Sequence, residues 1–66
     1  MTILLNGERH PLSRAMSVRE LLAELELPPE RVAVELNRRI LKRTDFDGVQ
    51  VTDGDELEVV TFVGGG

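Results

Sequence analysis

The sequence ends in three consecutive glycines, Gly64, Gly65 and Gly66, and this ending is where its residues could do chemistry. Glycine has no Cβ and adopts either sign of φ, so a glycine tail can enter a narrow channel and leave its last carbonyl open to attack. Three extended residues reach about 10 Å. Because folding does not require three glycines after a strand, we expect residues 64–66 to be a mobile tail that carries the Gly66 carboxylate into a partner's active site.

That carboxylate must be activated before it can react as an acyl group. A carboxyl group at a chain end is ionised at neutral pH, and the anion is a poor electrophile. Activation to a mixed anhydride needs a nucleotide, yet the sequence has no Gly-x-x-x-x-Gly-Lys-Ser/Thr loop to hold phosphates. We therefore expect another protein to be the activating enzyme. The alternative, that the glycines are an inert end, stays open.

The remaining polar residues are not arranged like a catalytic site. His10 is the single histidine and stands beside Pro11 with no cysteine or assignable serine partner, so we expect it to be structural. Asp53 and Asp55 flank Gly54, a pattern more typical of a turn than of a cation site. A short basic stretch is interpreted as a solvated loop or part of a docking surface; its members are Arg38, Arg39, Lys42 and Arg43.

Length and composition narrow the possible functions. With 66 residues the chain has room for one domain, residues 1–66, and little spare core for a ligand pocket. The absence of cysteine excludes disulfides, thiolate metal sites and a cysteine nucleophile. A net charge of -4 and two aromatic residues do not favour nucleic acid and suggest a partner with a basic docking surface. No early apolar run is long enough for a signal peptide or membrane span, so a cytoplasmic location is the default expectation.

The first half of the sequence predicts a hairpin followed by a helix. Residues 2–5 favour a strand, Asn6-Gly7 favours a two-residue turn, and the return strand at about 8–12 contains Pro11, which suggests a sheet edge. Ser17 and Glu20 form a capping box, and the apolar residues after Ser17 recur with helical spacing. Met16 is expected to act with Leu21 as a hydrophobic staple. The Pro28-Pro29 pair is expected to end the helix. The predicted buried face of the helix is Val18, Leu21, Leu22 and Leu25.

The second half predicts three strands. Residues 32–36 alternate between apolar and exposed positions, Asn37-Arg38 is a turn, and residues 39–41 return as a short strand. The longest strand is predicted at 56–63. One helix can cover one face of this sheet, which predicts an α+β fold with a mixed sheet of four to five strands packed on a single α-helix.

A single helix leaves the other sheet face open. On the last strand, Leu57, Val59 and Val63 are the better inward set, which leaves Val60 and Phe62 facing outward, together with Leu4 of the first strand. Apolar residues just before a reactive tail suggest a docking surface. The predicted partner-binding residues are Leu4, Val60, Phe62 and the residue next to the tail, Val63.

In this order and spacing, several motifs together resemble the β-grasp, ubiquitin-like sulfur carriers, and most closely the ThiS family of thiamin biosynthesis. The likeness covers the whole chain. Its most specific parts are the ending Leu57–Gly66 and Asp53-Gly54-Asp55 before it, with a middle stretch from Val34-Glu35-Leu36-Asn37 through Ile40-Leu41 to Arg43 and Phe46.

The resemblance implies a carrier that is not itself an enzyme. It implies that a ThiF-type enzyme uses ATP and Mg to adenylate Gly66, and that sulfur from a desulfurase system then gives a thiocarboxylate. A ThiG-type thiazole synthase would accept that sulfur. The carrier would bind no cofactor, metal, nucleic acid or membrane. Two alternatives remain: a carrier of the same fold for another pathway, like the small subunit of molybdopterin synthase, and a ubiquitin-like interaction module with an inert tail.

Overall fold

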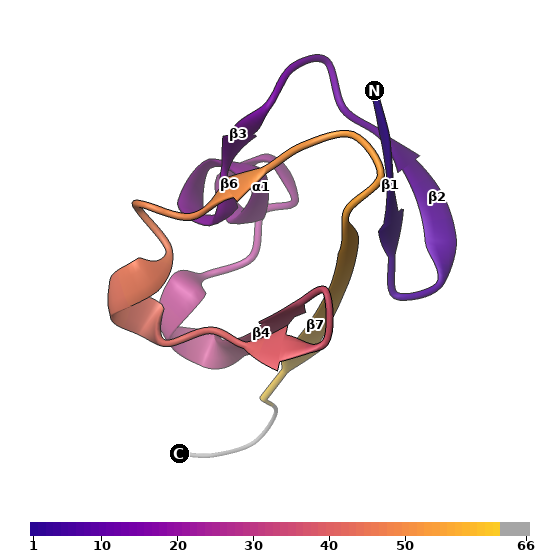
Figure 1. The fold of residues 1–66 in the computed structure, drawn as a ribbon. Coiled ribbons are helices and arrows are strands. Elements are labelled where there is room, and N and C mark those ends of the chain that lie inside the picture. Colours follow the sequence, from indigo (N-terminus) through magenta and orange to yellow (C-terminus); the bar gives the residue numbers. More distant parts are fainter. Residues whose placement is uncertain (63–66) are drawn as a thin grey trace.

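The computed structural model describes residues 1–62, so the predictions made for Val63 and for the glycines 64–66 lie outside the described residues. Along the chain the elements alternate between short strands and helical turns around one α-helix (Figure 1). They are β1 (Thr2–Leu5), β2 (Glu8–Pro11), β3 (Met16–Ser17), α1 (Val18–Glu24), a 3₁₀ turn (Pro29–Arg31), β4 (Val32–Leu36), β5 (Arg39–Ile40), a second 3₁₀ turn (Arg43–Asp45), β6 (Gln50–Val51) and β7 (Glu56–Thr61).

Five strands form the main sheet in the order β2-β1-β7-β4-β5, with β7 in the middle. β7 pairs parallel with β1 and antiparallel with β4, and the remaining pairs are antiparallel. The predicted mixed sheet on one helix is therefore confirmed. β2 is an edge strand, as Pro11 indicated, because an edge position does not require every backbone N–H to join the ladder.

Both hairpins of the sheet turn through residues with positive φ. Asn6 and Gly7 have φ of 52° and 82°, and Asn37 and Arg38 have φ of 52° and 71°. Two-residue turns of this kind match the right-handed twist of the strands they join. The second turn fixes the register so that Ile40 stands opposite Glu35.

The helix begins as predicted and ends earlier. Ser17 Oγ accepts from the Glu20 N–H (3.0 Å) and Glu20 Oε1 accepts from the Ser17 N–H (2.9 Å). The Ser17 N–H, followed by the Arg14 guanidinium, lowers the pKa of the Glu20 carboxyl group. At the other end Glu26 has φ of 59°, and the Leu27 N–H donates to the Leu22 carbonyl (2.9 Å). This Schellman ending stops the helix before Pro28 acts.

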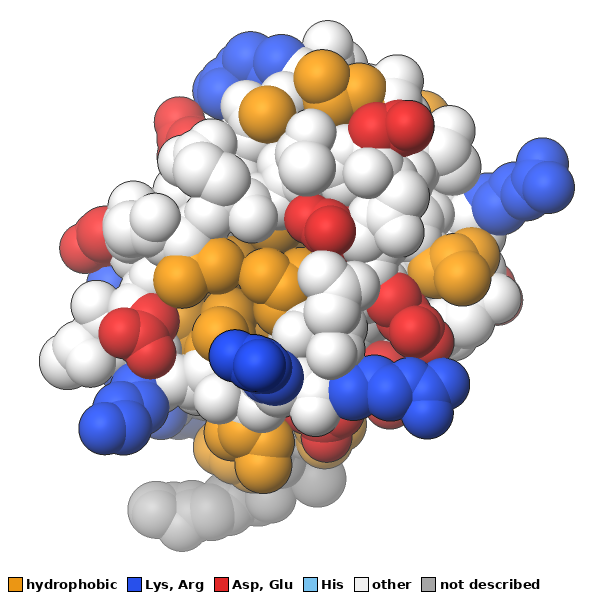
Figure 2. Space-filling model, in the orientation of Figure 1, with side chains coloured by type: hydrophobic (Ala, Val, Ile, Leu, Met, Phe, Trp, Pro, Cys, Tyr) orange, Lys and Arg blue, Asp and Glu red, His pale blue; other side chains and the backbone are white. Residues whose placement is uncertain are grey.

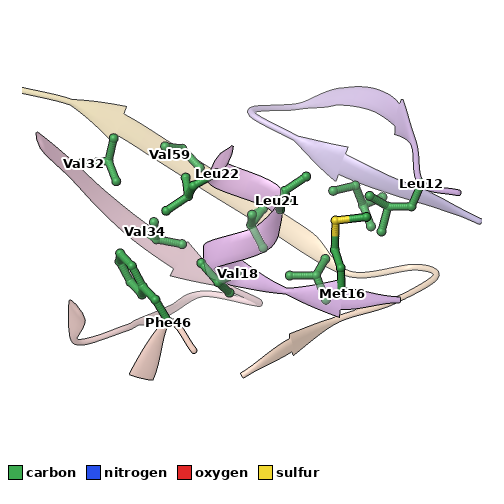
Figure 3. Close-up of a cluster of buried hydrophobic side chains, with 12 residues drawn as sticks. Leu12, Met16, Val18, Leu21, Leu22, Val32, Val34, Phe46 and Val59 are labelled. Carbon is green, nitrogen blue, oxygen red and sulfur yellow. The ribbon is translucent and has the colours of Figure 1, made fainter. Parts of the chain in front are cut away.

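The core lies between α1 and one face of the sheet (Figure 3). Helix residues Val18, Leu21 and Leu22 are buried as predicted, whereas Leu25 is only partly buried at the C-cap. Phe46, which was not among the predicted core residues, is buried in the same core and is the largest fully buried side chain among the described residues.

A second, two-stranded sheet was not predicted. Met16 pairs with Val51 and Ser17 with Gln50 in antiparallel β3 and β6. Met16 is therefore a buried strand residue, and the predicted helix staple did not include this strand pairing. Three strand ends also differ from expectation: β2 ends at Pro11, β5 at Ile40 and β7 at Thr61. Leu12 turns into the core after β2, and Leu41 packs against the core after β5.

We predict that Glu26→Gly stabilises the protein and that Glu24→Gly, the matched control, destabilises it. Glu26 holds a left-handed conformation that glycine adopts without strain, whereas Glu24 is helical. The expected changes in the free energy of unfolding are about 0.5 to 1 kcal/mol each, in opposite directions. Thermal melts of the two variants measure them, and a loss of stability in Glu26→Gly would contradict the assignment.

Candidate functional site

The end of β7 is tied to the sheet on both of its edges. On the β4 side, the Phe62 N–H donates to the Arg31 carbonyl (2.8 Å). On the β1 side, the Asn6 side chain bonds both backbone groups of Val59: Oδ1 accepts from its N–H (2.8 Å) and Nδ2 donates to its carbonyl (3.2 Å). The residues that follow Phe62 thus begin from a strand end with a defined position.

The outer face of the sheet carries an apolar patch close to this strand end. We define the outer patch as Ala33, Ile40, Val60 and Phe62. Val60 stands opposite Ala33 in the β4–β7 ladder, and a shallow hollow is lined by both of them together with Ile40. The exposed fractions of Ile40, Val60 and Phe62 are 79%, 58% and 52%. The predicted outward orientation of Val60 and Phe62 is therefore confirmed.

Leu4 is exposed as predicted, but the structure does not bring it to the outer patch. Leu4 pairs with Glu56, four residues before Val60 on the same strand. At about 3.3 Å per residue this separates them by about 13 Å along the sheet. Ile40 joins the patch instead, and sequence reasoning missed it. The signal was the Asn37-Arg38 turn, whose two-residue length fixes which face Ile40 occupies.

The inward face of β7 agrees with prediction as far as it is described. Leu57 is fully buried and Val59 is 8% exposed, whereas Thr61, next on that face, is exposed. The core therefore ends at Val59. Val63 lies outside the described residues.

Two glutamates stand side by side next to the outer patch. Glu35 and Glu58 are direct neighbours across β4 and β7, and both line the hollow. Like charges placed opposite each other destabilise a sheet slightly. No ion pair to either glutamate occurs within residues 1–62. A cationic side chain from outside the molecule would relieve this repulsion, in line with the expected basic partner surface.

The acidic pair near the C-terminal strand has turn roles, as predicted. Asp53 Oδ1 accepts from the Thr2 N–H (2.8 Å) and Asp55 Oδ2 accepts from the Thr52 N–H (2.8 Å), around Gly54 with φ of 85°. His10 lies opposite Ile3 on the edge pair of strands. Within residues 1–62 there is no group of three or more side chains that could hold a metal ion.

One residue of the basic stretch, Arg43, has a structural role. The Arg43 guanidinium donates to the Pro29 and Glu30 carbonyls (both 3.2 Å), so it fastens the two 3₁₀ turns together. The face seen in Figure 2 shows basic and acidic side chains interspersed, with no continuous basic area. Within the described part of the chain, no helix has the length and apolar character needed to cross a membrane.

Several known proteins are similar to this chain. The model of the ThiS family matches residues 3–66. The crystal structure of a thiamine biosynthesis protein, ThiS, from Geobacter metallireducens is similar over the whole of both chains, with a TM-score of 0.87 and 39% identity. The sulfur carrier protein ThiS of Bacillus subtilis is 38% identical over 50 residues, which are 76% of each chain.

Longer proteins are also similar. A thiazole synthase of Paramagnetospirillum magneticum is 44% identical over 66 residues, which are 100% of this chain and 20% of that protein. A thiazole synthase of Magnetococcus marinus is 41% identical with the same coverage. This chain thus spans a fifth of the length of these two synthases.

The two phenylalanines offer a test of the face assignment. Phe46→Ala should lower the free energy of unfolding by about 3 to 5 kcal/mol, because it empties the core. Phe62→Ala should cost about 1 kcal/mol or less, because its side chain is half exposed. Urea denaturation measures both, and equal losses would show that Phe62 belongs to the core.

Proposed function

Because this chain belongs to the ThiS family, the sulfur carriers of thiamin biosynthesis, we propose that it carries sulfur as a thiocarboxylate on Gly66. The resemblance found in the sequence is confirmed by the family match and by the shared fold. The chain acts as a carrier rather than a catalyst, so the chemistry on Gly66 requires partner enzymes. The observation that carries the proposal is the match of the ThiS family model to residues 3–66, which include the terminal glycines.

The proposed chemistry has two steps on the last carbonyl carbon. A carboxylate oxygen of Gly66 first attacks the α-phosphorus of ATP in a ThiF-type enzyme, which forms an acyl adenylate and releases pyrophosphate. The ATP and Mg are bound by that enzyme, where Mg neutralises phosphate charge. A desulfurase system supplies sulfur as a persulfide, a thiol reductant converts it to the sulfide oxidation level and is itself oxidised to a disulfide, and the sulfide then attacks the acyl carbon. The bond to AMP breaks, and a thiocarboxylate remains.

The thiocarboxylate is proposed to be delivered to a ThiG-type thiazole synthase. In that enzyme the thiocarboxylate sulfur attacks an electrophilic carbon of the thiazole precursor and forms a new C–S bond. Water then attacks the acyl carbon of Gly66, the acyl C–S bond breaks with the sulfur staying on the precursor, and the Gly66 carboxylate is regenerated. Gly64 and Gly65 serve as the narrow linker, since they add no side chain to obstruct a channel. The absence of cysteine leaves no thiol within the chain to attack the activated terminus.

The outer patch is proposed to dock both enzymes, and Val63, the next residue in the sequence after Phe62, remains a predicted partner-binding residue. An aromatic and aliphatic residues on one strand face have the composition of an interface anchor. The neighbouring Glu35 and Glu58 favour a partner surface that presents a cation beside an apolar area. Leu4 belongs to a separate part of the same face and is expected to contribute at the margin.

We expect any residue added after Gly66 to abolish carrier activity without changing the melting temperature. The extension removes the free carboxylate, while the core residues of the described chain lie between Ile3 and Val59. After the native protein is incubated with the ThiF-type enzyme, ATP and the desulfurase system, mass spectrometry should show a species heavier by the difference between sulfur and oxygen. Gly65→Ala keeps the free carboxylate but adds a side chain to the linker, so we expect it to lower carrier activity less than the extension does. A fully active, unprocessed extended protein would refute the proposal.

We expect Phe62→Ala to weaken binding to both enzymes by about 1 to 3 kcal/mol, the range of an interface anchor. Leu4→Ala, a comparable truncation on the same face but outside the outer patch, should have a smaller effect. Isothermal titration calorimetry with the ThiF-type enzyme and with the thiazole synthase measures both. If Leu4→Ala has the larger effect, docking centres on β1 and not on the outer patch.

A further inference from the structure

The Asn6 side chain takes the place of a missing strand residue. β1 ends at Leu5, and the Asn6 backbone N–H still donates to the Leu57 carbonyl (2.8 Å). From there the side-chain amide continues the ladder, because its oxygen and nitrogen bond the N–H and carbonyl of Val59 as a peptide group would. One residue therefore extends the parallel pairing by two positions along β7.

Beyond Val59, the β1 edge of β7 has no further hydrogen-bond partner within residues 1–62. On the opposite edge, the Arg31 carbonyl holds the Phe62 N–H. The Asn6 amide is thus the last described attachment on its side before the chain continues toward Gly66. A turn by itself does not need this side chain, since glycine also adopts positive φ at such positions.

We propose that Asn6 is a positioning residue for the carrier reaction: its amide fixes the direction in which β7 leaves the sheet and so where Gly66 is delivered. This rests on the proposed function. Gly66 lies seven residues after Val59, which is up to about 23 Å of extended chain. The chain toward Gly66 starts from this strand end, so a shift of the end changes where that chain starts, and misplacement of a reacting group by about 1 Å can cost a reaction about 100-fold.

The matched control is Asn37, the corresponding residue of the other hairpin. Asn37 also has φ of 52°, and its Oδ1 accepts from the Glu56 N–H (2.9 Å) at the start of β7. Asn6→Gly and Asn37→Gly each remove one amide that bonds the β7 backbone, and each leaves a residue that tolerates the turn. They differ in which end of β7 they release.

ATP–pyrophosphate exchange by the ThiF-type enzyme, with the carrier as the varied substrate, separates positioning from folding. We expect Asn6→Gly to lower kcat by about tenfold or more with KM within about twofold, because the outer patch still docks while the carboxylate is misplaced. Asn37→Gly should leave both constants within about twofold. Thermal melts set a temperature at which both variants are folded. Asn6→Asp keeps the acceptor and loses the donor, and it replaces Asn6→Gly if that variant does not fold.

Hydrogen exchange gives a second readout that does not depend on the enzyme. The amides of Val59 and Phe62 should exchange faster in Asn6→Gly than in Asn37→Gly. Equal effects of the two variants on kcat, or an unchanged kcat in folded Asn6→Gly, would overturn the proposal. If the wild-type chain supports no exchange reaction, the proposed function fails. The comparison at Val59 and Phe62 then still shows whether Asn6 holds this strand end, and equal exchange there would overturn that role.

Discussion

The structure depends on β7 being hydrogen-bonded along both of its edges. β1 lies parallel on one side and β4 antiparallel on the other, so the last strand of the sequence is the middle strand of the sheet. Its side chains alternate between the core and the outer face, as Leu57 and Val60 illustrate. The strand that supports the core therefore also carries the proposed docking residues and leads to the end proposed to react, and its alternation keeps core and docking roles on different residues.

A domain of this size needs its loops to complete the core. The segment after β5 supplies Phe46 to the core, and its backbone also serves the helix. The Val18 and Arg19 N–H groups, which have no partner within a helix, donate to the Val49 and Phe46 carbonyls (both 3.0 Å). Together with the Ser17 cap, the loop satisfies the first turn of α1 and holds Phe46 beneath it. The loop is thus held both by the packing of Phe46 and by its hydrogen bonds to α1. These contacts add to the stability that a short helix can supply by itself.

Sequence reasoning found the features that are local. The Asn6-Gly7 turn, the capping box and the alternation of β4 each occupy a few consecutive residues, so their chemistry can be read without knowing the rest of the fold. The missed features join distant residues. Phe46 has no apolar periodicity around it that would mark it as core, and the β3–β6 pair joins segments of two residues each. The Asn6 bonds to Val59 span 53 positions, and an asparagine in a turn gives no sign of them.

The residues of the candidate site follow the same division between local features that were predicted and long-range features that were missed. Alternation assigned Val60 and Phe62 to the outer face, because one helix covers only one side of a sheet. Ile40 was missed, since a two-residue strand has no alternation of its own and its face depends on pairing with β4. The basic stretch was treated as a unit, although Arg43 bonds carbonyls 13 and 14 positions away. Only the pairing partner or the hydrogen-bond partner distinguishes such residues.

The size of the outer patch limits how the proposed carrier can work. Four residues form a surface well below the roughly 800 Å² per partner of a standard interface, so contacts centred on it suit transient complexes. Weak binding suits the proposed cycle, in which the carrier must leave the activating enzyme before it binds the synthase. Tight binding to the activating enzyme would slow that dissociation. If both enzymes dock on this patch, as proposed, they compete for it. Discrimination between them must then come from the chemical state of Gly66, which changes between the two encounters.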